Sequence, residues 1–155
     1  MFKKIILWCA LISCMSLIFY FSSQEADVSQ GTSSRFIKTV VRIIDFNNKL
    51  AEEEIDALSE KVSTLVRKTA HFSIYAVLTL IFTLLLSQYK IYGKRQFLFA
   101  LLLCFLYACS DEIHQLFVPG RSGEIKDVLL DTLGGAFGSG IIKILSIRRE
   151  KNELH

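Results

Sequence analysis

Residues 97–118 read FLFALLLCFLYACSDEIHQLFV, and this stretch holds both features that decide the architecture. Its first part, through Cys109, is apolar. A cluster of acids, histidine and glutamine then follows: Asp111, Glu112, His114 and Gln115. The apolar part alone is shorter than the ~20 residues that a spanning helix needs. The stretch therefore predicts a transmembrane helix whose polar cluster lies at the bilayer boundary or just inside it.

Three other segments are apolar enough to span a membrane, at residues 5–21, 69–89 and 128–147. Hydrophobic residues make up 52% of the 155-residue chain, and Pro119 is its one proline. The sequence thus predicts an all-α membrane protein. Residues 1–155 would form a single domain, a bundle of four transmembrane helices. A net charge of +3, without basic and aromatic residues interleaved in a polar setting, excludes nucleic-acid binding.

The first segment has an alternative interpretation. Leu11-Ile12-Ser13-Cys14, behind Lys3 and Lys4, matches a lipoprotein cleavage box. The apolar run continues to Phe21 without a break, which favours a retained span. The cysteines lie in apolar runs without Cys-x-x-Cys spacing, so neither a metal site nor a cofactor is predicted.

The segment between the first two spans, residues 22–66, is too long for a simple turn. A first amphipathic helix on the membrane surface is predicted by the helical spacing of Phe36, Ile37, Val40, Val41 and Ile44. A second is predicted by Ile55, Leu58, Val62 and Leu65, with Glu52, Glu53 and Glu54 in its first turn. It should run directly into the second span. Either these helices only cover the bundle or they contact a substrate.

Orientation is predicted from the Lys and Arg residues. They are concentrated in the short tails and in one short loop on the side of the N-terminus, and spread over long segments on the other side. We therefore expect a multi-pass protein of the cell membrane with both termini in the cytoplasm.

Polar residues occur at one end of every predicted span. Since consecutive spans run in opposite directions, these ends lie on the same side of the membrane, which the orientation makes the extracytoplasmic side. The candidate substrate-binding residues at this level are Ser23, Gln24, Arg67, Lys68, His71, Asp111, Glu112, His114, Gln115, Arg121, Asp127 and Asp131. Ionisable groups at membrane depth are costly and usually mark a site. A purely structural ion-pair network is the alternative.

Helical register relates several of these residues. Asp127 and Asp131 are four apart, and their face continues to Gly134 and Gly138, a pair that allows another helix to approach closely. Lys68, His71 and Tyr75 share a face of the second span. The acid-bearing face of the fourth span should therefore be its packed face.

Arg121 follows Val118-Pro119-Gly120, which is a strong turn signal. The turn would fold the chain back over the site and place Arg121 above the carboxylates as a mobile or clamping cation.

The chain resembles the VanZ-like membrane proteins, which are associated with teicoplanin (glycopeptide) resistance in Gram-positive bacteria. The matching stretches are 21–24, Arg67 to Phe72 with Tyr75, and Ser110 to Gln115 continuing through Pro119-Gly120-Arg121, Asp127, Asp131 and Gly134. The resemblance implies an integral membrane protein with an external polar site and a role at the cell envelope. It implies no reaction. Ile74 stands where many relatives carry a polar residue.

Three functions are compatible with these residues. In the first, the site binds an anionic envelope lipid or a lipid-linked cell-wall precursor through Arg67, Lys68 and Arg121. In the second, the protein is an intramembrane enzyme in which Asp111, Glu112 and His114 perform acid–base chemistry on a lipid-linked phosphate. Transport ranks last, because the charges gather at one face. The sequence decides neither catalysis nor the oligomeric state.

Overall fold

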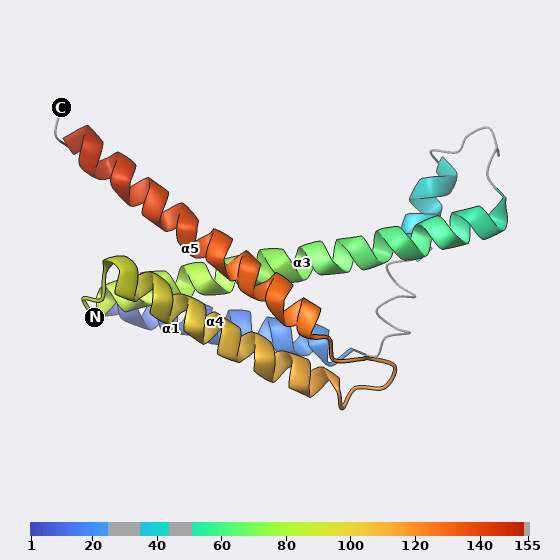
Figure 1. The fold of residues 1–155 in the computed structure, drawn as a ribbon, viewed down its shortest axis with the longest axis horizontal. Helices are drawn as coiled ribbons and strands as arrows, with labels where there is room; N and C mark the ends of the chain where they lie inside the picture. Colours follow the sequence, from blue (N-terminus) through green and yellow to red (C-terminus); the bar gives the residue numbers. More distant parts are fainter. Residues whose placement is uncertain (25–34, 44–50, 154–155) are drawn as a thin grey trace.

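The computed structural model describes residues 1–24, 35–43 and 51–153, with side chains through residue 142. The named helices are α1 (Phe2–Ser22), α3 (Glu52–Gln88), α4 (Gly93–Gln115) and α5 (Ile125–Glu153), and a short helix occupies residues 35–43 (Figure 1). The described ranges contain no strand. The predicted all-helical class is confirmed.

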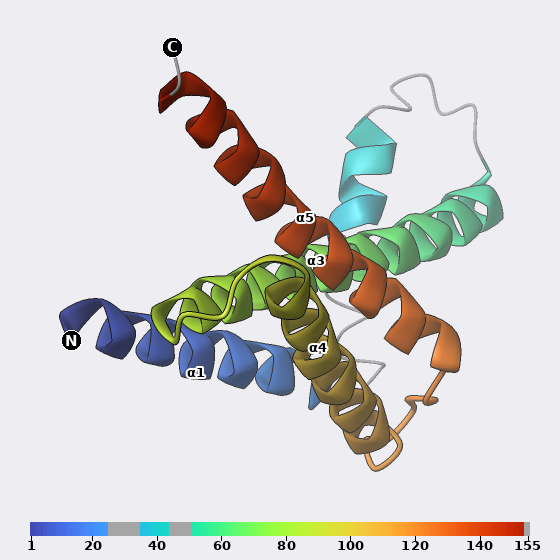
Figure 2. The same cartoon turned by 60° about the vertical axis from the view of Figure 1, so that its left-hand side comes forward.

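α3 is the central element of the bundle. It contacts α1, α4 and α5, whereas α1 and α5 each pack on α3 and α4 but not on each other. Figure 2 shows α5 crossing α3 obliquely while α1 and α4 lie beside the C-terminal half of α3. The apolar core between these helices is formed by Leu11, Ile18, Leu78, Phe82, Ala100, Cys104 and Ala108.

Three helices, α1, α3 and α4, are long and apolar enough to cross a membrane. They contain the first two predicted spans almost entirely and most of the third. The predicted fourth span, 128–147, lies within α5, but α5 is not among these three helices over its described residues, so the count of four spans stays a prediction.

The third predicted span reaches Val118, but α4 ends at Gln115. Residues 116–118 form i−3 hydrogen bonds to the carbonyls of Ile113, His114 and Gln115. Pro119 explains the difference, because proline disfavours α-helical geometry in the residue before it and has no N–H to continue the ladder. The span was therefore predicted slightly too long.

The predicted continuity between the second loop helix and the second span is confirmed, because α3 runs unbroken for 37 residues. Its N-terminal half extends beyond the bundle, with the helix at 35–43 beside it (Figures 1 and 2). That short helix buries Ile37 and pairs Lys38 with Asp56. Its location on the membrane surface stays a prediction, and Ile44 lies outside the described residues.

The crossing of α3 and α5 depends on glycine. A Cβ atom added at Gly134 would collide with the carbonyl group of Phe72, and one added at Gly138 would collide with that of Ala76. This confirms that the acid-bearing face of α5 is its packed face. Without side chains at these points, the two backbones come into direct contact.

A stripe of buried and partly buried hydroxyl groups follows α3 along the apolar core at i, i+4 spacing. We call Thr79, Thr83 and Ser87 the hydroxyl stripe. Each hydroxyl donates to the carbonyl oxygen four residues earlier, and Thr83 also lies 3.1 Å from Ser139 Oγ on α5. Gln96 Nε2 on α4 donates to Thr83 O at 2.8 Å. This stripe was not predicted from the sequence, because serine and threonine barely change the hydropathy of a span.

Candidate functional site

Asp111 lies at the centre of a buried group of polar side chains at the ends of the helices. Its Oδ2 atom accepts hydrogen bonds from Ser22 Oγ at 2.8 Å, Tyr75 Oη at 3.3 Å and Gln115 Nε2 at 3.3 Å. Asp111 is 4% exposed and Ser22 and Tyr75 are fully buried. These contacts join α1, α3 and α4 in one polar layer, as the convergence of helix ends predicted.

Asp131 on α5 lies on the other side of this layer and is 3% exposed. Its Oδ2 atom lies 3.7 Å from His71 Nδ1, which is an ion-pair distance but too long for a hydrogen bond. The second carboxylate oxygens of Asp111 and Asp131 are buried and have no hydrogen-bond partner among the described residues.

His114 points away from this layer. Its Nε2 lies 3.0 Å from Ser23 Oγ, and its ring stacks on Phe19 with 4.3 Å between centroids. Ser23 Oγ also donates to Phe19 O at 2.6 Å. Because a hydroxyl has one proton, His114 is the donor in its contact with Ser23.

The three candidate acid–base residues therefore face different surroundings. Asp111 faces the buried layer, Glu112 faces the turn before α5, and His114 packs against α1. Acid–base catalysis requires groups within hydrogen-bond reach of one reacting centre, and these three side chains do not share one.

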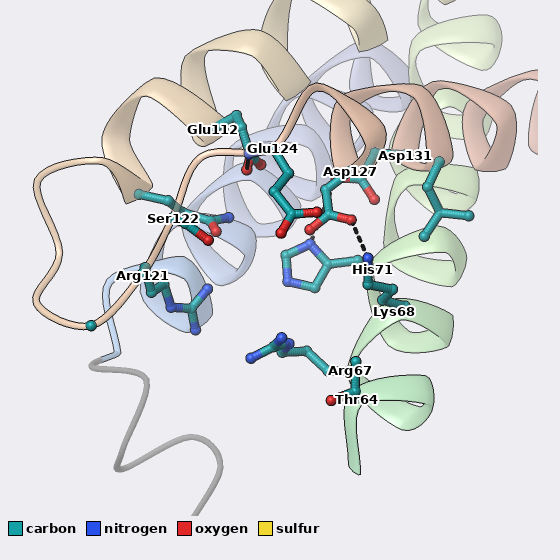
Figure 3. Close-up of a pocket in the computed structure, with 13 residues that line it drawn as sticks. Thr64, Arg67, Lys68, His71, Glu112, Arg121, Ser122, Glu124, Asp127 and Asp131 are labelled. Atoms are coloured by element: carbon teal, nitrogen blue, oxygen red, sulfur yellow. Dashed lines mark hydrogen bonds and ion pairs between the residues drawn. The ribbon is translucent and has the colours of Figure 1, made fainter. Parts of the chain in front are cut away.

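A cavity of about 260 Å³ opens between α3, α4, α5 and the turn that joins α4 to α5 (Figure 3). Its lining combines acids, cations and neutral polar groups. The lining residues are Thr64, Arg67, Lys68, His71, Glu112, Gln115, Gly120, Arg121, Ser122, Glu124, Asp127, Leu130 and Asp131.

Several charges in the cavity are already paired. Lys68 Nζ lies 2.6 Å from Asp127 Oδ1, both side chains being about one-third exposed. Glu112 Oε1 accepts the backbone N–H of Glu124 at 2.6 Å. This contact fixes the start of α5 against the end of α4. The acidic wall of the cavity, formed by Glu112, Glu124 and Asp127, is therefore bound to α3 through Lys68 and joined across α4 and α5 through Glu112.

Arg121 is placed by the turn that the sequence predicted. Gly120 has φ 75°, and the N–H of Arg121 donates to Val118 O at 3.2 Å, which is a type II pattern with Pro119 and Gly120 at its centre. The direction of the side chain differs from the expectation. Its guanidinium donates to Gln24 O at 2.9 Å and Phe21 O at 3.1 Å, not to a carboxylate.

This difference has a physical reason. The last carbonyls of a helix lack intrahelical partners and carry partial negative charge, so the end of α1 attracts a cation. Arg121 is bound to the end of α1 and still lines the cavity, but it does not lie above the carboxylates as predicted.

Arg67 is the second guanidinium at the cavity, and it has no hydrogen bond or ion pair to any described residue. It is half-buried on α3. Figure 3 shows it on the same side of the cavity as Arg121, opposite Glu112, Glu124 and Asp127. Burial lowers the pKa of the Arg121 guanidinium, and the nearby positive charge of Arg67 lowers this pKa further. The two cations therefore repel each other on this side of the cavity.

The predicted site residues fall into two groups. Those that line the cavity are Arg67, Lys68, His71, Glu112, Gln115, Arg121, Asp127 and Asp131. Ser23, Gln24, Asp111 and His114 lie nearby but do not line it. That any of them binds a substrate stays a prediction.

Several residues of the polar site were not predicted from the sequence. Ser22, not Ser23, donates to Asp111, because the last turn of α1 directs Ser22 inward. Thr64, Ser122 and Glu124 line the cavity without having been predicted. The position of Glu124 just before α5 was the one available signal, since acids favour helix N-termini.

The described residues include no group of three His, Cys, Asp or Glu side chains placed to hold a metal ion. The four cysteines, all of which are described, are free.

The comparisons with known proteins agree with this architecture. The family model described as VanZ/LLP1 matches residues 7–146, nearly the whole chain. Neither the comparison with curated proteins nor that with solved structures gives a match. The matched range includes every polar helix end and the cavity, and the chain is therefore a membrane protein that belongs to the VanZ/LLP1 family.

Proposed function

We propose that the cavity binds the phosphate-bearing headgroup of an anionic envelope lipid or of a lipid-linked cell-wall precursor. The observation that carries this proposal is the pair of guanidinium groups, Arg67 and Arg121, that face one cavity without a carboxylate partner among the described residues. Two such cations repel each other, and a phosphate between them removes that repulsion. Arginine binds phosphate oxygens bidentately, which suits this position.

The opposite wall supports a headgroup with further polar groups. Glu112, Glu124 and Asp127 lie across the cavity from the two arginines (Figure 3). Carboxylates accept hydrogen bonds from sugar hydroxyls or from an ammonium group. The shared ligand chemistry is therefore a phosphate group, and the acidic wall favours hydroxyl or amino substituents on it.

The size of the cavity favours a headgroup over a whole molecule. Its volume of about 260 Å³ is below the range of pockets that enclose drug-sized ligands. The apolar chains of the lipid would remain in the bilayer, against the exposed apolar side chains of the spanning helices. A glycopeptide effect would then be indirect, through reduced access of the antibiotic to its lipid-linked target.

The first test measures lipid binding by the Arg67→Gln variant. Native mass spectrometry of the full chain, with phosphatidylglycerol and a polyprenyl phosphate as probes and phosphatidylcholine as reference, should show that the variant binds the anionic probes about tenfold more weakly, the loss expected for one charge-assisted interaction. Arg67 holds no other described residue, so folding should be unchanged.

Lys61→Gln is the matched control, because Lys61 is exposed on the same helix and does not line the cavity. It removes the same charge and should leave binding unchanged. Equal loss in both variants would mean that only the overall charge matters. Wild-type binding of anionic lipids no tighter than of phosphatidylcholine would refute the proposal.

The resistance association is tested with the same pair. In a Gram-positive host whose teicoplanin susceptibility falls on expression of this chain, Arg67→Gln should restore susceptibility at equal membrane levels, and Lys61→Gln should not. Full resistance with Arg67→Gln would separate the cavity from the phenotype.

A further inference from the structure

The side chain of Asp131 is buried without the hydrogen bonds that stabilise an ionised carboxylate. Its side chain is 3% exposed, it receives no hydrogen bond from any described residue, and its Oδ1 atom has no partner. Its one ionisable neighbour at ion-pair distance is His71, whose Nδ1 atom is 3.7 Å away. Burying a carboxylate whose only charged or hydrogen-bonding contact is this long one to a histidine costs several kcal/mol, so such groups often become neutral.

Asp111, in the same layer, also has an Oδ1 atom without a partner, but its Oδ2 atom differs from that of Asp131. Three donors, from Ser22, Tyr75 and Gln115, converge on its Oδ2 atom. Hydrogen bonds from several donors stabilise the charged form of a carboxylate. The two aspartates are buried to a similar degree but have different partners. Hydrogen-bond donors converge on the carboxyl group of Asp111 and not on that of Asp131.

The groups around Asp131 make a second charge still less favourable. The titratable groups near Asp131 are Asp111, Glu112 and Cys104 from α4, Asp127 from α5, and His71 and Tyr75 from α3. The turn contributes Arg121, which is near His71, and α1 does not contact α5. Three acids thus surround Asp131 and one histidine opposes them.

A metal ion does not fit this layer as well as a proton does. The groups that face Asp111 Oδ2 present O–H and N–H donors, which would direct positive charge at a cation. No group of three acid, histidine or cysteine side chains converges among the described residues. A proton needs only one carboxyl oxygen.

We propose that Asp131 is a proton-binding residue, whose buried carboxyl group is protonated at neutral pH. The proton exchanges with the cavity, because both Asp131 and His71 line it. This site does not depend on the lipid proposal.

The test compares two isosteric variants of the full chain in detergent at neutral pH. Asn replaces a neutral carboxyl group with little change, so Asp131→Asn should melt within about 3 °C of wild type. Asp111→Asn replaces the carboxyl group on which three donors converge and should melt about 5 °C or more lower. A fall for Asp131→Asn as large as that for Asp111→Asn would overturn the proposal.

Infrared spectroscopy of wild type and Asp131→Asn gives a second measurement. Wild type should show the carbonyl stretch of a protonated carboxyl group, shifted in D₂O, and Asp131→Asn should lose it. Asp56→Asn, at an exposed position on α3, should retain it. Absence of the band from wild type at neutral pH would refute the proposal.

A comparison of two salts distinguishes proton binding from binding of a small cation. The melting temperatures of wild type in sodium chloride and in choline chloride should be equal at equal ionic strength. Stabilisation by sodium that is lost in Asp131→Asn would show that the carboxylate is ionised and holds sodium instead.

Discussion

Ser22 and Ser23 are adjacent, yet their hydroxyl groups lie in different surroundings. Ser22 is fully buried and donates to Asp111 on α4, whereas Ser23 is exposed and contacts His114. The buried contact links the last turn of α1 to the polar layer. It is worth more than an exposed one, because its loss leaves part of a buried carboxylate unsatisfied.

Ser22→Ala should therefore destabilise the protein by about 1–3 kcal/mol, the usual cost of leaving a buried polar group without its partner. Thermal unfolding in detergent measures the effect. Ser73→Ala is the control, because Ser73 is exposed and donates only to Thr69 O of its own helix. Equal stability of Ser22→Ala and wild type would show that the contact with Asp111 contributes nothing.

At the level of residues, the sequence predicts which side chains gather but not their partners. Alternating span directions suffice to bring Asp111, His71 and Asp131 to one level. The choice between Ser22 and Ser23 depends on the phase of the last turn of α1, which is set by packing. The direction of Arg121 depends on the carbonyls that α1 leaves free, and no pattern in the turn sequence contains that information.

Among the elements, the closest approach is that of α3 and α5. Gly138→Ala places a methyl group against the Ala76 carbonyl and should cost about 3 kcal/mol, at the upper end for overpacking, because the obstacle is backbone. Gly140→Ala meets nothing within 4 Å. It should be neutral or stabilise by about 0.5–1 kcal/mol, since alanine favours helix over glycine.

Thermal unfolding of both variants distinguishes a packing effect from a general effect of replacing glycine. A neutral result for Gly138→Ala would mean that α3 and α5 separate without cost, which would contradict tight packing at this crossing. Gly138→Ala should also disturb the cavity, because α5 carries Asp127 and Asp131.

The helices themselves were largely predictable. Apolar length gave the cores of the spans, and the Ile55 to Leu65 spacing gave the continuation that makes α3 a single helix. The end of α4 was misplaced because hydropathy extends through Phe117 and Val118, while Pro119 ends the helix earlier. The hydroxyl stripe was missed because threonine and serine barely change hydropathy, although they connect α3 to α4 and α5.

For the whole molecule, the predicted orientation places the N-terminal half of α3 outside the cell. Lys61→Cys should therefore react with a membrane-impermeant maleimide in intact cells, and Lys94→Cys only after permeabilisation, because charge asymmetry favours a cytoplasmic N-terminus. The wild-type chain, whose own cysteines lie in apolar helices, is the background control. The reverse labelling pattern would place the cavity on the cytoplasmic side.

The length of α3 has a mechanical consequence. Its 37 residues extend about 55 Å, against about 30 Å for a hydrocarbon core. α3 packs closely against α5 at Phe72, which Gly134 approaches, so a tilt of α3 would turn about this crossing. Glu52 lies about 30 Å from it and Arg67 about 8 Å. If the outer end of α3 moved sideways by several ångströms, Arg67 would move about one-fourth as far, because it lies about four times closer to the crossing. A large displacement outside the bundle would then shift the guanidinium at the cavity only slightly.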